Sequence, residues 1–197
     1  MELTVLGSGT AVPHPRRSSP GFWLQTRGGT LMLDLSASSL HRMAQENLDW
    51  AGLDSIWISH FHLDHCGGLG PFLFASLGAP ETRARTKPLR IFGAPGLRGL
   101  VHALNSGGSK RLLEQPYPVE IVEVEPLEKF QILDNVEAVA YSTPHTPDSH
   151  AIRLRESDTT LVYTSDTGFD EKLATFARRV DLLLMECSFV KDKPVLK

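Results

Sequence analysis

Residues 58–69 read ISHFHLDHCGGL and place three histidines and one aspartate within six positions: His60, His62, Asp64 and His65. Such a cluster is unfavourable in a hydrophobic core, because a buried imidazole or carboxylate destabilises the fold unless it is hydrogen-bonded. A solvated polar turn is the alternative interpretation. Four nitrogen and oxygen donors at this spacing are instead typical of a metal site. The stretch therefore predicts metal binding.

The segments on either side explain how the cluster would be presented. LDSIWIS, at 53–59, has the composition of a buried strand, and it delivers the histidines at its carboxyl end. Open α/β sheets place their chemistry just beyond the carboxyl ends of their strands. Gly67 and Gly68 allow a tight turn, after which residues 69–78 are expected to form a helix.

The rest of the chain alternates predicted strands and helices. In the first half we expect strands at 2–6, 22–26, 30–36 and 90–94, with helices at 38–46 and 96–105. The pattern of predicted elements changes near residue 116, after which strands dominate, apart from one helix at about 170–179. We expect a single α/β domain over 1–197, a sandwich of two sheets with helices outside, with halves at about 1–115 and 116–197.

The overall composition excludes several classes of protein. With 197 residues, 41% of them hydrophobic and 22% charged, the chain should fold rather than stay disordered. Its net charge of −3 gives no general electrostatic reason to bind nucleic acid. We expect no membrane segment, no signal peptide and a cytoplasmic location. Cys66 and Cys187 are too few for a disulfide framework, and we interpret both as reduced packing residues near the cluster.

Two later stretches extend the pattern into a family resemblance. In STPHTPDSHAIRL, His145 follows a predicted strand, and in LVYTSDTG, Asp166 does the same. With HxHxDH, these stretches resemble the dinuclear hydrolases of the metallo-β-lactamase family over most of the chain. The resemblance implies an αββα sandwich of two mixed sheets. It also implies that His60, His62 and His145 hold one ion, that Asp64 and His65 hold another, and that Asp166 bridges the two.

The resemblance also implies the chemistry. Two ions would lower the pKa of a water and clamp an oxyanion, with Asp64 orienting the metal-bound hydroxide as nucleophile. Imidazole and carboxylate donors without thiolate suit two Zn²⁺ ions, while Mn²⁺ and iron stay open. The second histidine of the cluster, where oxygen reductases of this fold carry Glu, favours hydrolysis over redox chemistry.

Within the family, the opening LGSGTAVPHPRRSSPG resembles the branch of ribonuclease Z and related phosphodiesterases. Arg16 and Arg17 would suit a phosphate, because a guanidinium pairs with its oxygens in a bidentate manner. His14 could approach the site from the same loop. His150 is a further candidate substrate contact, with a structural imidazole as the alternative.

RNA stays open as a substrate, although one departure argues for a smaller phosphodiester. Only 21 positions (166 − 145) separate His145 from Asp166, where tRNA-processing members insert a long RNA-grasping arm. The basic run TRARTKPLR at 82–90 lacks interleaved aromatic residues, and we interpret it as a solvated loop. His41 and His102 lie in predicted helices, and we assign them no ligand role.

Three functions remain open at this point. The first is a metal-dependent phosphodiesterase, and the second is an acyl hydrolase acting on a thioester, lactone or β-lactam with the same ligands. The third is a metal-binding protein without turnover. The complete ligand motif favours an enzyme.

The end of the sequence adds one more expectation. In the family, the strand equivalent to VDLLLMECSF precedes a segment that brings one more histidine to the second ion, whereas here VKDKPVLK ends at Lys197. We therefore expect missing C-terminal elements, a second ion that binds more weakly than the first, and an uncovered sheet edge that invites a homodimer.

Overall fold

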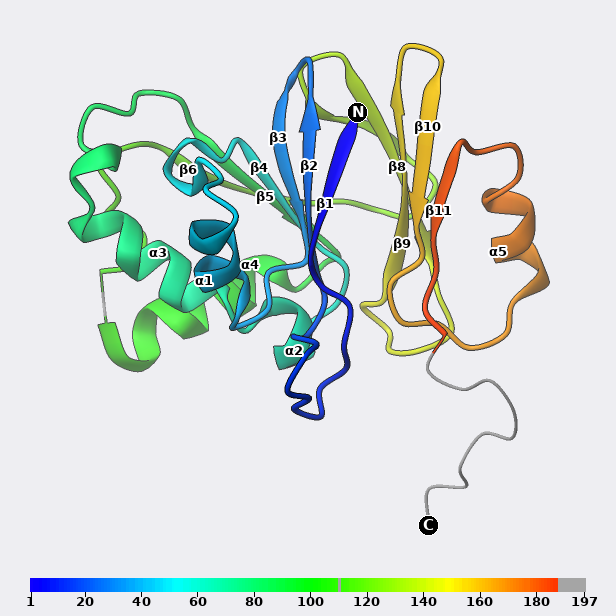
Figure 1. Cartoon of the computed structure of the whole chain (residues 1–197), viewed down its shortest axis with the longest axis horizontal. Coiled ribbons are helices and arrows are strands. Elements are labelled where there is room, and N and C mark those ends of the chain that lie inside the picture. Colours follow the sequence, from blue (N-terminus) through cyan, green and yellow to red (C-terminus); the bar gives the residue numbers. More distant parts are fainter. Residues whose placement is uncertain (110, 188–197) are drawn as a thin grey trace.

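The computed structural model describes residues 1–109 and 111–187, which form two packed β-sheets with helices on their outer faces (Figure 1). The first sheet has six strands in the order β1 (Glu2–Gly7), β2 (Gly21–Thr26), β3 (Gly29–Leu33), β4 (Ser55–Ile58), β5 (Leu89–Gly93) and β6 (Val119–Glu123). The second has the order β11 (Leu182–Leu184), β10 (Thr159–Tyr163), β9 (His150–Glu156), β8 (Val136–Ser142) and β7 (Lys129–Leu133). The predicted α/β sandwich is confirmed.

The helices lie on the outer faces of the two sheets. One group covers the first sheet, and α5 (Glu171–Phe176) lies outside the second (Figure 1). The covering elements are α1 (Ser39–Gln45), α3 (Leu69–Gly78) and α4 (Leu97–Leu104), with the short α2 (Leu63–Cys66), η1 (Trp50–Gly52), η2 (Pro80–Thr82) and η3 (Asn105–Ser109) between them. None of the helices in the described part of the chain is long and apolar enough to cross a membrane.

Side-chain alternation along the central strands builds two separate cores. In β4, Ile56 faces the helices, whereas its neighbour Trp57 faces the second sheet. Trp57 packs there in the same cluster as Ile132 and Ile152, and Ile56 packs in the same cluster as Phe72 of α3. Because β4 is buried on both faces, its near-continuous apolar sequence is what a central parallel strand requires.

One predicted boundary differs from the structure. The change of pattern near residue 116 would place the strand 119–123 in the second half, yet β6 pairs in parallel with β5 at the edge of the first sheet. Parallel neighbours need a crossover connection, and α4 supplies it between β5 and β6. The division between the sheets therefore falls after Glu123.

The basic run 82–90 is also more ordered than a solvated loop. The guanidinium of Arg85 donates to the carbonyl oxygens of Ala51, Leu53 and Pro88 at 2.8–2.9 Å and lies 4.3 Å from the ring centroid of Tyr117. Arg85 therefore fastens this loop to the segment that precedes β4 instead of offering its charge to a partner.

Candidate metal centre

The histidine cluster lies where strands from both sheets end. His60 and His62 follow β4 of the first sheet. His145 follows β8 and Asp166 follows β10 of the second. The backbone N–H of His150 donates to the carbonyl oxygen of Ser59 at 2.9 Å and so joins the two sheets beside the cluster. Residues 106 positions apart in the sequence are brought together in this way.

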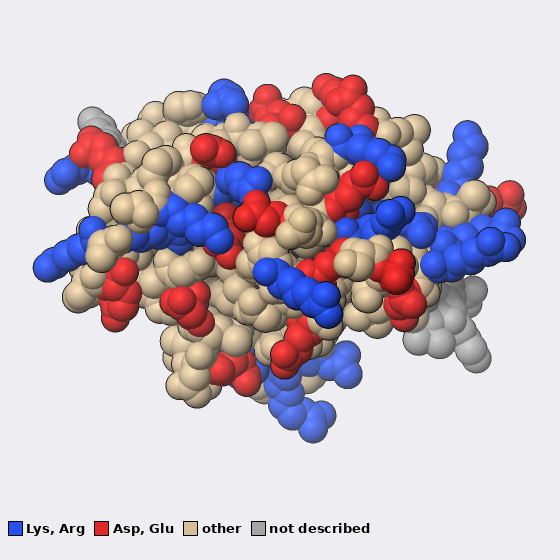
Figure 2. Space-filling model, turned by 90° about the horizontal axis from the view of Figure 1, so that it is seen from above, with Lys and Arg blue, Asp and Glu red and all other residues tan. Residues whose placement is uncertain are grey.

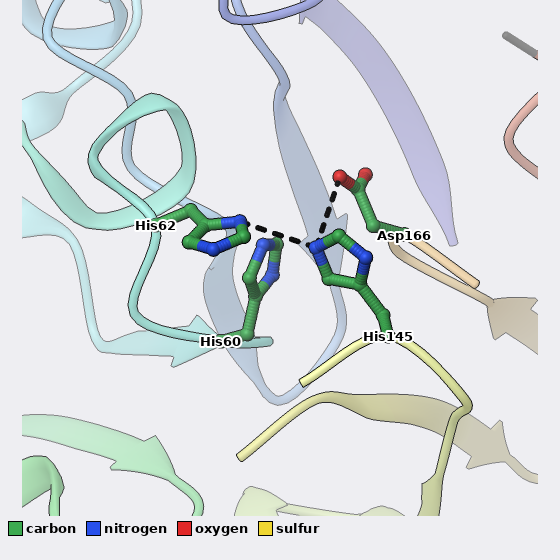
Figure 3. A group of neighbouring side chains, drawn as sticks. All are labelled: His60, His62, His145 and Asp166. Carbon is green, nitrogen blue, oxygen red and sulfur yellow. Dashed lines mark hydrogen bonds and ion pairs between the residues drawn. The ribbon is translucent and has the colours of Figure 1, made fainter. Parts of the chain in front are cut away.

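Four of the predicted ligands form one compact group. The ligand atoms of His60, His62, His145 and Asp166 all lie within 4.8 Å of one another. Nε2 of His145 lies 3.1 Å from Nδ1 of His62 and 3.6 Å from a carboxylate oxygen of Asp166, and the rings point to a common centre (Figure 3). Three imidazole nitrogens and a carboxylate at this spacing are a suitable donor set for a divalent ion.

His60 provides the clearest test of whether this set fits a metal. Its side chain is fully buried, and its Nε2 has no hydrogen-bond partner among residues 1–109 and 111–187. Burial and the neighbouring His65 lower the pKa of His60 to about 4, so its imidazole is neutral near pH 7. A buried nitrogen without a hydrogen-bond partner destabilises the fold unless another group binds it. A metal cation can do so, because the lone pair of a neutral imidazole nitrogen is a metal ligand.

The remaining two predicted ligands lie beside the first group. Nε2 of His65 lies 3.6 Å from a carboxylate oxygen of Asp64 and 3.3 Å from one of Asp166. Burial lowers the pKa of His65, but the carboxylates of Asp34 and Asp166 outweigh it and raise the pKa to about 10. Asp166 therefore contacts both groups, which is the position the family resemblance implies for a bridging carboxylate.

The sequence did not single out Asp34, the most connected residue beneath the cluster. Its fully buried carboxylate accepts hydrogen bonds from the Ser59 backbone N–H at 2.8 Å, from Tyr163 Oη at 2.6 Å and from His65 Nδ1 at 2.6 Å. The available signal was an acidic residue at the end of the apolar run TLMLDLS, because a buried acid is costly unless other groups satisfy it.

Asp148 was missed as well. Its carboxylate accepts a 2.7 Å hydrogen bond from the backbone N–H of Phe61, which lies between His60 and His62. On the same side, Oγ1 of Thr143 donates to the carbonyl oxygen of Asp166 at 3.0 Å. These contacts align the three ligand-bearing loops with one another.

A cavity of about 900 Å³ opens over the ligands. Its wall includes the loop of residues 8–14, together with Arg17 and the apolar side chains of Phe22, Leu184 and Met185. Arg17 therefore faces the same cavity as His62 and Asp166. Arg16 instead lines a neighbouring hollow of about 470 Å³, which Arg17 and His14 share.

The structure corrects the expected substrate contact of His150. Its side chain is 2% exposed and is not among the lining residues of the described cavity, because its strand β9 lies inside the sandwich. The alternative, a structural imidazole, fits this position. Of the remaining candidates, His14 does line the cavity, His41 and His102 are exposed on their helices, Cys66 is buried and Cys187 is exposed at the cavity wall.

Comparison with known proteins places this geometry in context. The sequence profile described as "Anti-Pycsar protein Apyc1" matches residues 1–195. The probable metallo-hydrolase YhfI of Bacillus subtilis is 23% identical over 98% of this chain and 75% of its own length. Ribonuclease Z of Mycobacterium sp. (strain KMS) is 29% identical, and the match covers 85% of this chain but only 61% of that relative.

Solved structures agree on the fold. A crystal structure of YhfI, described as a metallo-β-lactamase fold protein, superposes with a TM-score of 0.74 at 22% identity, covering 95% of this chain and 71% of that one. The short form of human tRNase Z gives a TM-score of 0.78 at 20% identity, covering 93% and 76%. The chain thus has the metallo-β-lactamase fold and is similar to proteins of the ribonuclease Z branch.

Proposed function

The chain belongs to the family of the anti-Pycsar protein Apyc1, and from this premise we propose that it is a metal-dependent hydrolase whose substrates are small phosphodiesters. One observation carries the proposal. The convergent donors His62 and Asp166 line the same cavity as Arg17. A phosphodiester needs both a cationic clamp on its oxygens and an activated water, and this cavity offers groups for each.

The donor set defines which residues would hold metal. His60, His62 and His145 would hold the first ion, Asp64 and His65 would hold the second, and Asp166 would be shared. Nitrogen and oxygen donors without thiolate favour Zn²⁺, with Mn²⁺ and iron as alternatives. Metal at these positions would lower the pKa of a bound water and stabilise negative charge developing on substrate oxygens.

The remaining roles belong to the chain itself. Arg17 would pair with the non-bridging oxygens of the phosphodiester and orient it over the ligands. Asp64 lies at the cavity with its side chain 16% exposed, so its carboxylate can orient the attacking water and accept its proton. His14 would contact the substrate from the opening loop.

Two features support a small substrate over a folded RNA. Between His145 and Asp166 the chain forms a plain hairpin of β9 and β10 with a two-residue turn at Ser157 and Asp158. The second feature is charge: the chain has a net charge of −3, and acidic and basic side chains are interspersed on the face in Figure 2, which lies at the end of the sandwich away from α2 and the ligand-bearing loops. RNA-binding surfaces depend on continuous basic tracks for most of their affinity.

Acyl hydrolysis is the second candidate, and the apolar wall of the cavity favours it. Phe22, Leu184 and Met185 would suit the acyl group of a thioester or lactone. The ligand set would be the same for both reactions. The two candidates therefore differ in the role of Arg17.

A substrate screen separates the candidates. Bis(p-nitrophenyl) phosphate, a phenyl thioester and a lactone would be offered to the protein loaded with zinc or manganese. We expect turnover of the phosphodiester and a loss of about 10- to 100-fold in kcat/KM on Arg17→Ala, the size of one charged hydrogen-bonded contact. Arg16→Ala is the matched control and should retain most of the rate. Thioester or lactone turnover without phosphodiester turnover would select the second candidate, and no turnover with metal bound would select the non-catalytic one.

A further inference from the structure

A buried network of hydroxyl groups connects Asp34 to both metal positions. Oγ of Ser59 donates to Oδ2 of Asp34 at 2.8 Å and accepts from Oγ of Ser165 at 2.6 Å. The same Ser59 oxygen lies 3.1 Å from Nδ1 of His60. Asp34 Oδ2 also lies 2.6 Å from Nδ1 of His65. One carboxylate oxygen therefore reaches a ligand of each metal position, directly for His65 and through one hydroxyl for His60.

The direction of each hydrogen bond follows from the carboxylate. An ionised carboxylate can only accept, so His65 must donate its Nδ1–H to Asp34. Because Nδ1–H is held by Asp34, the proton that a metal ion would displace from the His65 ring is the one on Nε2. Nε2 of His65 is therefore available to bind a cation, and this nitrogen lies beside Asp64 and Asp166.

The same reasoning extends by one step to His60. The single proton of the Ser59 hydroxyl goes to Asp34, and the proton of the Ser165 hydroxyl goes to Ser59. Ser59 thus has no proton left to donate to His60, so Nδ1 of His60 must carry the hydrogen and donate it to the Ser59 oxygen. The lone pair then lies on Nε2, the buried nitrogen without a partner among the described residues.

We propose that Asp34 is a positioning residue that sets the tautomer of one ligand imidazole at each metal position, His65 directly and His60 through Ser59. This inference rests on the proposed function only in that these imidazoles bind metal. Tyr163 adds a further donor to the same carboxylate oxygen at 2.6 Å, but it lies on neither path to an imidazole. The two metal positions thus share one orienting group, so a change at Asp34 reaches both.

Three variants give three different outcomes. In Asp34→Asn, the Ser59 backbone N–H holds the amide oxygen in the place of Oδ1, so the amide NH₂ occupies the place of Oδ2 and donates instead of accepting. We expect the affinity for zinc to fall by about 10- to 100-fold at both positions, the usual cost of losing such a partner. Ser59→Ala should weaken the first position alone. Tyr163→Phe is the control and should leave both affinities unchanged.

The experiment combines calorimetric titration with zinc alone and ¹⁵N NMR of the histidine rings in the zinc-loaded protein. We expect Nδ1–H signals for His60 and His65 in the wild type, and loss of the His60 signal alone in Ser59→Ala. An Nε2–H signal for either ring, or equal loss of affinity at both positions in Ser59→Ala, would overturn the proposal. So would a wild type that takes up no zinc.

Hydrolysis is measured separately, so the two proposals can fail independently. The expected ring signals without phosphodiester turnover would refute the proposed function alone. Turnover with an Nε2–H signal at His60 or His65 would refute the tautomer assignment alone.

Discussion

The two sides of the ligand cluster differ in what holds them. His60 and His65 form a floor that is at most 1% exposed, and the Nδ1 atom of each ring faces Asp34 or the hydroxyl that Asp34 orders. His62 and His145 form an exposed rim, where the two rings face each other with nitrogens 3.1 Å apart. The floor joins its ligands to the buried network, whereas the rim brings together loops from two different sheets.

This difference shows how one small cluster combines rigidity with access. Floor ligands are oriented by the fold itself, since their hydrogen bonds exist without metal or substrate. The rim ligand His62 borders the cavity of about 900 Å³, where a substrate would enter. Substitutions in the floor should therefore affect folding as well as metal binding, whereas rim substitutions should affect metal binding alone.

The largest effect on folding is expected from Asp34→Ala in the floor. The change leaves His65 and Tyr163 without the acceptor that both use, in a fully buried place. Breaking a buried charge pair by removing one partner costs about 3–5 kcal/mol. Urea unfolding of the metal-free protein should show a loss of this size. A loss below about 1 kcal/mol would mean that the floor is not preset by this network.

An intermediate effect is expected from Asp148→Ala. In the wild type, Asp148 joins the floor to the rim. Without its carboxylate the backbone N–H of Phe61 loses its acceptor, at a cost of about 1–3 kcal/mol. The loop that carries His62 should also become less well aligned with His145, so zinc affinity should fall. Asp158→Ala, at the exposed turn between β9 and β10, is the matched control. Equal unfolding midpoints for the two variants would argue against the alignment role.

The smallest effect on folding is expected from His62→Ala in the rim. An exposed side chain outside the buried network should change the free energy of unfolding by no more than about 0.5 kcal/mol. Zinc binding and hydrolysis should nevertheless be lost together, which unfolding and titration of the same sample can show. His102→Ala, exposed on α4, should change neither property. A large loss of stability in metal-free His62→Ala would remove the distinction between floor and rim.

The sequence could predict the parts of the site that local spacing determines. HxHxDH indicates ligands because its residues are neighbours in the chain, and the strand before it is recognisable from its apolar run. Asp34 and Asp148 could not be assigned in this way, since their partners lie 31 and 87 positions away. The strand β6 was placed in the wrong half for the same reason, because its partner β5 is reached only through a helical crossover.

The local sequence pattern also does not predict which polar side chains are exposed to solvent. His150 looked like a second histidine near the site, but it opens a strand inside the sandwich and is buried. Arg85 looked like one member of a solvated basic run, but it donates to backbone carbonyl groups of its own loop and of residues 51 and 53. In both cases the packing of distant elements decides the role.

The central claim is that this cluster is a metal centre, and the zinc content of the purified chain tests it most directly. Elemental analysis after mild purification should find at least about one zinc per chain in the wild type, and His62→Ala should lose it while remaining folded. Less than about half an equivalent in the wild type, with no uptake when zinc is added back, would contradict the account.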